Sequence, residues 1–334
     1  MSRQVSRRAF AGMAIGSSLM LAAGGLPIRR RRTSNGFEWH ALAEQKAWAT
    51  TNASTGGNVL VIGSRSEAMM VDAKFAGIVP LLRAEAEQRL DTGIGLLVNT
   101  HHHADHTGGN VGFTNDAEVL SHAAAVRRVA QQLERYDQQL DTGEAAMDRL
   151  VGPDKPAHLA ERLESLRALA RSNAAKAFVP TTTIDRYPMR RRVGELSVEL
   201  HHFGPGHTDN DVVVHVPELN LLHTGDLVFN GLHPFFDQSG GVSAAGWIRS
   251  LRMTRDLCNG ATAVVPGHGP ITDVSGIDRQ IDYLERLMEN VSRAIAQGRS
   301  RDETAAMRWE FMEGLGFEQI RPRAIAAVYD ELSP

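Results

Sequence analysis

Thr100-His101-His102-His103-Ala104-Asp105-His106-Thr107-Gly108-Gly109 is the stretch that decides the fold of this chain. Directly after the apolar run that starts at Ile94, it places four potential metal ligands within six residues, namely His101, His103, Asp105 and His106. Imidazole and carboxylate groups suit zinc and neighbouring first-row metals. Residues two apart in an extended segment point the same way, so His101 and His103 can chelate one ion. We therefore expect a metal centre at the end of a strand.

Three further segments place a histidine or an aspartate just after an apolar, strand-like run. They are Gly204-Pro205-Gly206-His207-Thr208, His223-Thr224-Gly225-Asp226 and Val264-Val265-Pro266-Gly267-His268-Gly269. In α/β proteins, ligands gather at the carboxyl ends of strands. Together with the pattern His-x-His-x-Asp-His at 101–106, these segments resemble the signature of the metallo-β-lactamase superfamily. The resemblance runs from about residue 45 to residue 275.

The resemblance implies a complete ligand set for two metal ions. His101, His103 and His207 would hold the first ion, Asp105, His106 and His268 the second, and Asp226 would bridge both. Asp105 would also orient the nucleophile or carry its proton. Two zinc ions per chain are the expected cofactor, and one iron is the alternative. Some lactamases of the superfamily use a thiolate where Asp226 stands, but the single cysteine, Cys258, lies away from every motif.

The first 26 residues are expected to be a signal peptide rather than part of the fold. Ser6-Arg7-Arg8-Ala9-Phe10 precedes a modestly apolar stretch that resembles a twin-arginine (Tat) export signal and is too mild for a stable membrane anchor. This implies the Tat export machinery as a partner and the periplasm as the location. Without the three arginines of the signal, 36 − 3 = 33 basic residues face 39 acidic ones, a net charge of −6. That balance disfavours a nucleic-acid partner and leaves a small-molecule substrate.

Hydrophobic periodicity predicts one domain over 45–334, preceded by a linker at 27–44. Strands are expected at 46–52, 57–64, 67–72 and 94–100, a helix at 78–90, and a second set of strands from about 180 to 230. A helical insertion at about 122–178 and a helical C-terminus at about 274–334 follow from three- and four-residue spacing. The fold class is therefore α/β, and the resemblance implies a four-layer αβ/βα sandwich. We expect the insertion either to thicken the outer layer or to lie over the metal mouth.

The function expected from this site is a zinc-dependent hydrolase. A metal-bound hydroxide would attack the carbonyl of an ester, thioester, lactone or β-lactam. A first alternative is an oxidoreductase similar to the persulfide dioxygenases of the superfamily, which hold one iron with two histidines and one aspartate. A second alternative is a phosphodiesterase of the same superfamily. Among the other histidines, His102 is either a support for the ligands or a loop filler, and His233 either lines the pocket or is an ordinary loop histidine.

Overall fold

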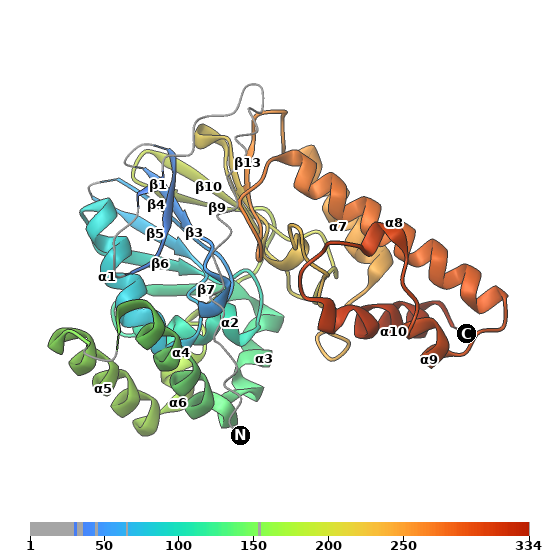
Figure 1. Cartoon of the computed structure of the whole chain (residues 1–334). Helices are drawn as coiled ribbons and strands as arrows, with labels where there is room; N and C mark the ends of the chain where they lie inside the picture. Colours follow the sequence, from blue (N-terminus) through green and yellow to red (C-terminus); the bar gives the residue numbers. More distant parts are fainter. Residues whose placement is uncertain (1–29, 32–35, 44–45, 65, 153–154, 334) are drawn as a thin grey trace, which may run out of the picture.

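Two β-sheets packed face to face between two layers of helices make up the described part of the chain (Figure 1). The structure is a computed structural model, and it describes residues 30–31, 36–43, 46–64, 66–152 and 155–333. The expected signal peptide at 1–26, with Arg7 and Arg8, lies outside the described residues. The site motifs all lie within them.

The first sheet has eight strands that follow one another in chain order. They are β1 (Arg30–Arg31), β2 (Trp39–Ala43), β3 (Ala47–Thr50), β4 (Val59–Gly63), β5 (Ala68–Val71), β6 (Ile94–Val98), β7 (Glu118–His122) and β8 (Thr182–Ile184). β1 to β5 pair antiparallel, whereas β5 to β8 pair parallel. Every residue of β4 and β5 is buried, as expected of strands covered on both faces.

β1 and β2 both lie within the segment 27–44, which we expected to be a linker, so that segment contributes two strands to the sheet. β2 is the longer of the two. It pairs with β3 from Trp39 opposite Thr50 to Ala43 opposite Ala47. The side chains of Phe37 and Trp39 are fully buried in the core. The Trp39 indole also donates a hydrogen bond of 2.8 Å to Glu85 on helix α1 (Val79–Leu90). The burial of these two large aromatic side chains stabilises the packing of β2 in the sheet.

The second sheet has five strands in the order β13, β12, β11, β10, β9. They are β9 (Met189–Val193), β10 (Leu196–His201), β11 (Val213–Val216), β12 (Leu221–His223) and β13 (Ala263–Val265). The predicted second set of strands began at about 180, but β8 belongs to the first sheet because it pairs parallel with β7 across the helical insertion. Only the β12–β13 pair is parallel in the second sheet.

Three apolar cores separate the layers and confirm the four-layer αβ/βα prediction. Alternate residues of one strand enter different cores: Leu60 and Ile62 of β4 face the second sheet, whereas Val59 and Val61 face the helices. The helices on the first sheet are α1, α3 (Ala123–Gln131), α4 (Tyr136–Val151), α5 (Ala157–Ser172) and α6 (Ala174–Phe178). Those on the second are α7 (Ala244–Asp256), α8 (Val274–Ala296) and α10 (Arg321–Leu332), with the short α9 (Arg301–Ala305) beside α10.

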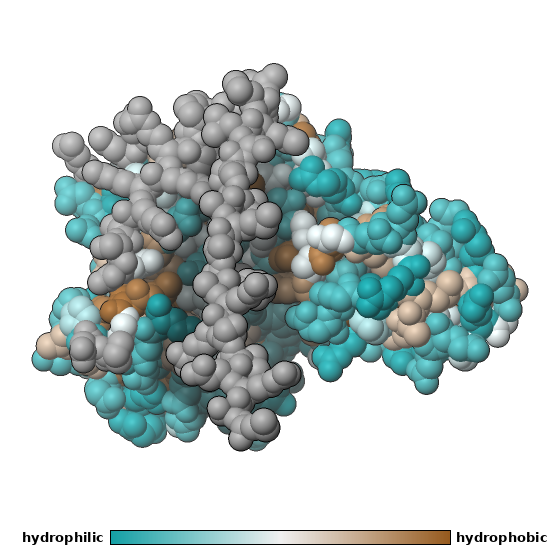
Figure 2. Space-filling view, viewed as in Figure 1, coloured by the Kyte–Doolittle hydropathy of each residue, from teal (hydrophilic) through white to brown (hydrophobic). Residues whose placement is uncertain are grey.

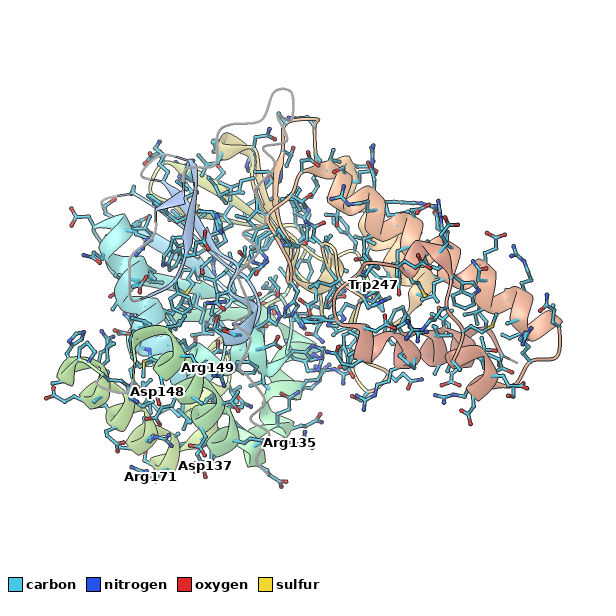
Figure 3. The ribbon with its side chains drawn as sticks, in the orientation of Figure 1. Arg135, Asp137, Asp148, Arg149, Arg171 and Trp247 are labelled. Atoms are coloured by element: carbon cyan, nitrogen blue, oxygen red, sulfur yellow. The ribbon has the colours of Figure 1, made fainter. Side chains whose placement is uncertain are left out.

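The predicted helical insertion corresponds to α3–α6, and the predicted helical C-terminus corresponds to α8–α10. Figure 3 places the charged residues of the insertion, such as Asp148 and Arg171, on the opposite side of the molecule from Trp247 of α7. In Figure 2, the coloured surface over the insertion and over the C-terminal helices is largely hydrophilic. Met253 is the exposed large apolar side chain among the described residues. None of the helices in the described ranges has the length and apolar character needed to cross a bilayer.

Candidate metal centre

The seven predicted ligands lie in loops at the ends of strands from both sheets. His101 and His103 follow β6, and the short helix α2 (Ala104–Thr107) carries Asp105 and His106. The other three come from the second sheet: His207 lies between β10 and β11, Asp226 follows β12, and His268 follows β13. Ligands from both sheets therefore meet at one site.

Four of these side chains form one group. The ligand atoms of His101, His103, His207 and Asp226 all lie within 4.8 Å of one another. His207 Nε2 is 3.2 Å from His103 Nδ1 and 3.4 Å from Asp226 Oδ2. His101 Nε2 lies 3.7 Å from the same carboxylate oxygen. The structure thus brings together the three histidines predicted for the first ion.

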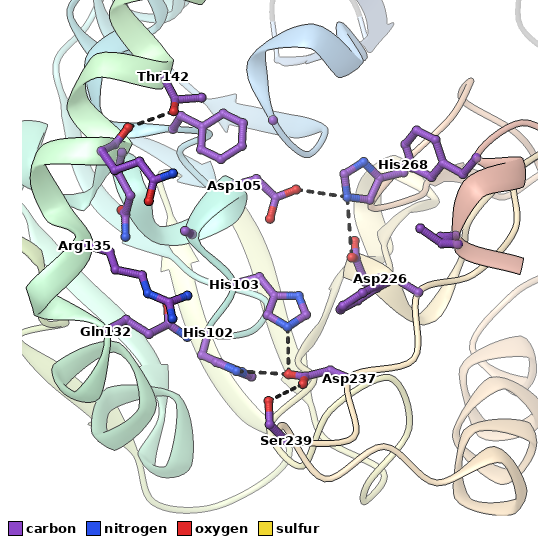
Figure 4. A pocket seen from close by; sticks show the side chains of 18 of the residues that line it. His102, His103, Asp105, Gln132, Arg135, Thr142, Asp226, Asp237, Ser239 and His268 are labelled. Carbon is purple, nitrogen blue, oxygen red and sulfur yellow. Dashed lines mark hydrogen bonds and ion pairs between the residues drawn. The ribbon is translucent and has the colours of Figure 1, made fainter. Parts of the chain in front are cut away.

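The remaining three side chains form a second group beside the first. Asp105, His106 and His268 also have ligand atoms within 4.8 Å of one another, and His268 Nε2 is 3.2 Å from Asp105 Oδ2. Asp226 connects the groups, since its Oδ1 is 3.2 Å from His106 Nε2. Its Oδ2 is 3.5 Å from His268 Nε2, a contact drawn in Figure 4. A carboxylate in this position can bridge two ions.

Unpartnered polar atoms at the centre of these groups fit a bound cation. His101 Nε2 is buried without a hydrogen-bond partner, and Asp226 Oδ1 contacts His106 Nε2 at 3.2 Å without forming a hydrogen bond. Leaving such atoms unsatisfied is costly, so a ligand at this point would be stabilising. The seven side chains supply imidazole nitrogens and carboxylate oxygens, which is the donor set that zinc accepts. The residues present therefore fit a pair of divalent ions.

The electrostatics of the site lead to the same conclusion. Burial lowers the pKa of His207 to about 3, so its imidazole is neutral and has a free lone pair. Although burial opposes its charge, the carboxylates of Asp226 and Asp105 raise the pKa of His268 to about 9. The pKa of Asp226 is held well below its usual range, against burial, by His268 and His106. The carboxylates of Asp226 and Asp105 thus draw positive charge to this point, and a divalent ion can supply it in place of protons.

Two aspartates that the sequence analysis missed orient the ligands. The buried carboxylate of Asp72 accepts a hydrogen bond of 2.7 Å from His106 Nδ1 and another of 2.8 Å from the Thr100 amide. Asp237 Oδ2 lies 2.9 Å from His103 Nε2 and 3.4 Å from His102 Nε2. Carboxylates behind ligating histidines fix the ring orientation and the tautomer. The position of Asp72 at the end of a predicted strand was the one signal available in the sequence.

Two glycines allow the backbone to approach the ligands. A Cβ atom at Gly57 would lie 2.2 Å from His106 Cε1, and one at Gly267 would lie 1.9 Å from Asp226 Oδ1. Neither ligand side chain could keep its place beside a larger residue. Gly57 is held in turn by the fully buried Lys74, whose Nζ donates a hydrogen bond of 2.7 Å to the Gly57 carbonyl. Burial lowers the pKa of Lys74 to about 7.

The structure decides between the alternative interpretations of two histidines, His102 and His233. His102 lines the pocket and contacts Asp237, so it supports the ligand loop rather than filling space. His233 is fully buried between Tyr283, whose hydroxyl is 2.9 Å from Nδ1, and Glu318, whose carboxylate is 3.1 Å from Nε2. It is not among the residues that line the pocket. The interpretation of His233 as an ordinary loop histidine is therefore the one that fits.

A cavity of about 710 Å³ opens onto the metal centre (Figure 4). Asp105, Asp226 and His268 form part of its floor, and Phe229 and Phe235 add apolar surface. One wall comes from the insertion, with Gln132, Arg135, Gln138, Gln139 and Thr142, and another from the C-terminal region, with Phe317, Gln319 and Ile320. The α3–α4 part of the insertion thus borders the mouth of the site. α5 contributes no lining residue.

Comparison with known proteins gives a match over this whole region. The family model described as Metallo-beta-lactamase superfamily matches residues 54–268, a range that includes all seven side chains. The probable metallo-hydrolase YqjP of Bacillus subtilis (strain 168) is 26% identical over 255 residues, which cover 72% of this chain and 76% of that protein. The metallo-beta-lactamase type 2 of Bacillus cereus is 27% identical over 94 residues, or 28% of this chain and 37% of the other.

Two solved structures share the fold. The metallo beta lactamase from Erythrobacter litoralis, with beta mercaptoethanol in its active site, has a TM-score of 0.54 and 17% identity, and the match covers 77% of this chain and 100% of that one. The metallo-beta-lactamase from Pontibacter korlensis has a TM-score of 0.50 and 18% identity, with coverage of 78% and 99%. At these identities the likeness is one of fold.

Proposed function

Because the chain belongs to the metallo-beta-lactamase superfamily of metallo-hydrolases, we propose that it is a hydrolase that uses two zinc ions. The observation that carries the proposal is the position of the Asp226 carboxylate between two ligand groups. One ion would be held by His101, His103 and His207, the other by Asp105, His106 and His268, and both by Asp226. Asp72 and Asp237 would keep the imidazoles of His106 and His103 in their ligating orientation.

The chemistry proposed is attack on a carbonyl carbon. When bound, two such ions lower the pKa of a water molecule to about 7 and polarise the oxygen under attack. Asp105 lines the pocket and would hold and pass on the proton of the attacking water. The Phe229 ring, stacked on His268 at 5.3 Å between ring centroids, adds apolar surface beside this ligand.

The proposed substrates are esters, thioesters, lactones or β-lactams of small-molecule size. A cavity of about 710 Å³ falls in the range of roughly 300–1,000 Å³ that suits such ligands. The apolar rings of Phe229 and Phe235 and the amide-bearing wall suit a substrate with both apolar and hydrogen-bonding parts. The thiol of Cys258 is not among the lining residues, so it offers no nucleophile for this reaction.

The decisive experiment combines metal analysis with a substrate panel. We expect at least two zinc ions per chain and hydrolysis of at least one of the four substrate types. Asp226→Asn should abolish turnover because both ions lose a shared ligand, whereas Asp302→Asn, at an exposed carboxylate of α9, should leave it unchanged. Retained hydrolysis in Asp226→Asn would refute the two-metal proposal. One iron and little zinc would instead favour oxygen-dependent sulfur chemistry.

The proposal includes export to the periplasm through the Tat route. Its support is the Arg7-Arg8 pair ahead of a mildly apolar stretch. Replacing both arginines with lysines should retain the charge but keep the full-length precursor in the cytoplasm. Cell fractionation and the size of the chain on a blot measure this. Periplasmic enzyme in the double-lysine variant would argue against the route.

A further inference from the structure

A separate group of histidine and carboxylate side chains lies on the second sheet, across strands β10 and β11. Glu199 and His201 are two residues apart on β10, so they share one face of the sheet. His215 of β11 lies directly opposite Glu199 in the antiparallel register. The ligand atoms of these three residues lie within 4.8 Å of one another. None of the three lines the cavity above the metal centre.

The distances in this group suit a single small cation. Glu199 Oε2 is 3.3 Å from His201 Nε2 and 3.6 Å from His215 Nδ1. Ligands that sit about 2.0–2.1 Å from a tetrahedral zinc ion are separated from each other by roughly 3.4 Å. Each nitrogen is therefore already close to that spacing from the carboxylate oxygen, and the two nitrogens lie within 4.8 Å of each other. Little side-chain movement is needed to bring all three onto one ion.

A buried nitrogen without a hydrogen bond lies in the same place. His215 Nδ1 is shielded from solvent and accepts or donates no hydrogen bond. The His201 side chain is buried as well, and its ring is stacked on Phe203 with 5.5 Å between centroids. Arg190 occupies the other carboxylate oxygen, with Nε 2.9 Å from Glu199 Oε1, and so leaves Oε2 turned toward the imidazoles. A cation bound at Oε2 would satisfy the unpartnered nitrogen.

The protonation states agree with this arrangement. Burial lowers the pKa of both His201 and His215, so each imidazole is neutral at neutral pH. The pKa of Glu199 is held below its usual value, against burial, by its hydrogen bond from Arg190. A neutral imidazole and an ionised carboxylate are the forms that bind metal.

We propose that Glu199, His201 and His215 form an additional metal site for zinc or a similar divalent first-row ion, distinct from the catalytic pair. Two imidazoles and one carboxylate make a three-ligand set that leaves a fourth position for water. β10 and β11 are joined by the loop 202–212, which carries His207. An ion across these strands fastens the base of that loop. The group of Glu199, His201 and His215 would thus have a structural role, whereas the metal centre would have the catalytic one.

Zinc stoichiometry tests the proposal without any use of enzyme activity. The untagged full chain, stripped of metal, is dialysed against Zn²⁺ alone, and bound zinc is counted by elemental analysis. We expect the wild type to bind one equivalent more than His201→Asn/His215→Gln, while the remaining equivalents stay bound in both. Equal zinc counts in the two proteins would overturn the proposal. Because the readout is the difference between them, it is independent of whether the hydrolase proposal holds.

Two further variants guard against misfolding and unspecific loss. Glu199→Gln keeps the shape of the side chain but removes its charge, so it should also lose the additional equivalent while retaining the wild-type circular dichroism spectrum. His158→Gln removes an exposed histidine of α5 and should bind as much zinc as the wild type. If Glu199→Gln keeps the full zinc count, or if His158→Gln loses an equivalent, the assignment to this group is wrong.

Discussion

Asp72 illustrates how a buried carboxylate that is not itself a proposed metal ligand can orient one. Its oxygens are 2.7 Å from His106 Nδ1 and 2.7 Å from the Thr100 hydroxyl, so it aims one ligand and anchors the start of the ligand loop. The residue has a φ of 60°, a conformation that aspartate and asparagine tolerate better than other side chains. Its two functions, turning the chain and orienting an imidazole, explain an aspartate at this position.

Replacing Asp72 with asparagine should weaken metal binding. The amide keeps the shape and the tolerance of a positive φ but loses the charge behind His106. We expect the affinity for zinc to fall about 10- to 100-fold, as measured by competition with a chromophoric chelator. Asp91→Asn is the matched control, since Asp91 also has a positive φ of 54° but is exposed at the end of α1. Unchanged affinity in Asp72→Asn would mean that this carboxylate does not orient the ligand.

Among the elements, the insertion wall is the part that should affect substrate binding alone. Gln138 of α4 lines the cavity, whereas its neighbour Asp137 is exposed and does not. Gln138→Ala should raise KM about 2- to 10-fold, the cost of one lost hydrogen bond, with kcat and zinc content unchanged. Asp137→Ala should leave all three values as they are. The measurement is steady-state kinetics on the substrate that the panel identifies. A fall in zinc content would show that α4 acts on the metal centre instead.

The start of α3 should make stability depend on pH. His122 caps this helix, since its Nδ1 accepts a hydrogen bond of 3.0 Å from the Ala124 amide. Burial, helped by His202, lowers its pKa from 6.5 to about 4. The unfolded chain therefore binds a proton at a higher pH than the folded one, so this contribution to stability is lost as pH falls from 6.5 to 4.

Thermal melts at a series of pH values test this dependence. His122→Asn keeps a capping oxygen but cannot titrate, so its melting temperature should fall less than that of the wild type between pH 7 and pH 5. His158→Asn, at an exposed histidine, should follow the wild-type curve. Parallel curves for His122→Asn and the wild type would show that His122 is not the titrating group.

The sequence predicted the elements that are marked by the spacing of nearby residues. It did not predict those that depend on contacts with residues far away in the chain. The helices α1, α4 and α5 and the ligand loop at 101–106 are marked by short-range spacing. β7 was missed because its five residues mix polar and apolar types and are stabilised by β6 and β8, its parallel neighbours. The pairing of Asp237 with His103, 134 residues apart, has no local trace in the sequence. Supports of this kind need the fold before they can be found.

In the molecule as a whole, the metal centre joins the two sheets. The first sheet supplies four of the proposed ligands and the second supplies three, so bound ions would tie the two halves together. Removing zinc with a chelator should lower the melting temperature by roughly 8 °C, if zinc is present at about 1,000 times its dissociation constant. Readdition of zinc should restore it.

Differential scanning fluorimetry with and without chelator measures this shift. Asp226→Asn should show a much smaller change on chelation, because its two ions would lose their shared ligand. Magnesium readdition is the control, since this hard ion prefers oxygen donors and should not restore the melting temperature. A chelator-insensitive wild type would show that the halves are held by their apolar cores alone.

The walls of the cavity and its floor come from different parts of the chain, and this separation gives a route to new specificity. The segments 132–142 and 317–320 line the mouth but carry none of the proposed ligands. The ligand loops, in contrast, are closed by glycines that admit no side chain. A library of substitutions confined to Arg135, Thr142, Gln319 and Ile320 could therefore change which substrates enter the cavity. The proposed ligands would stay unchanged, so directed evolution could alter specificity separately from the chemistry.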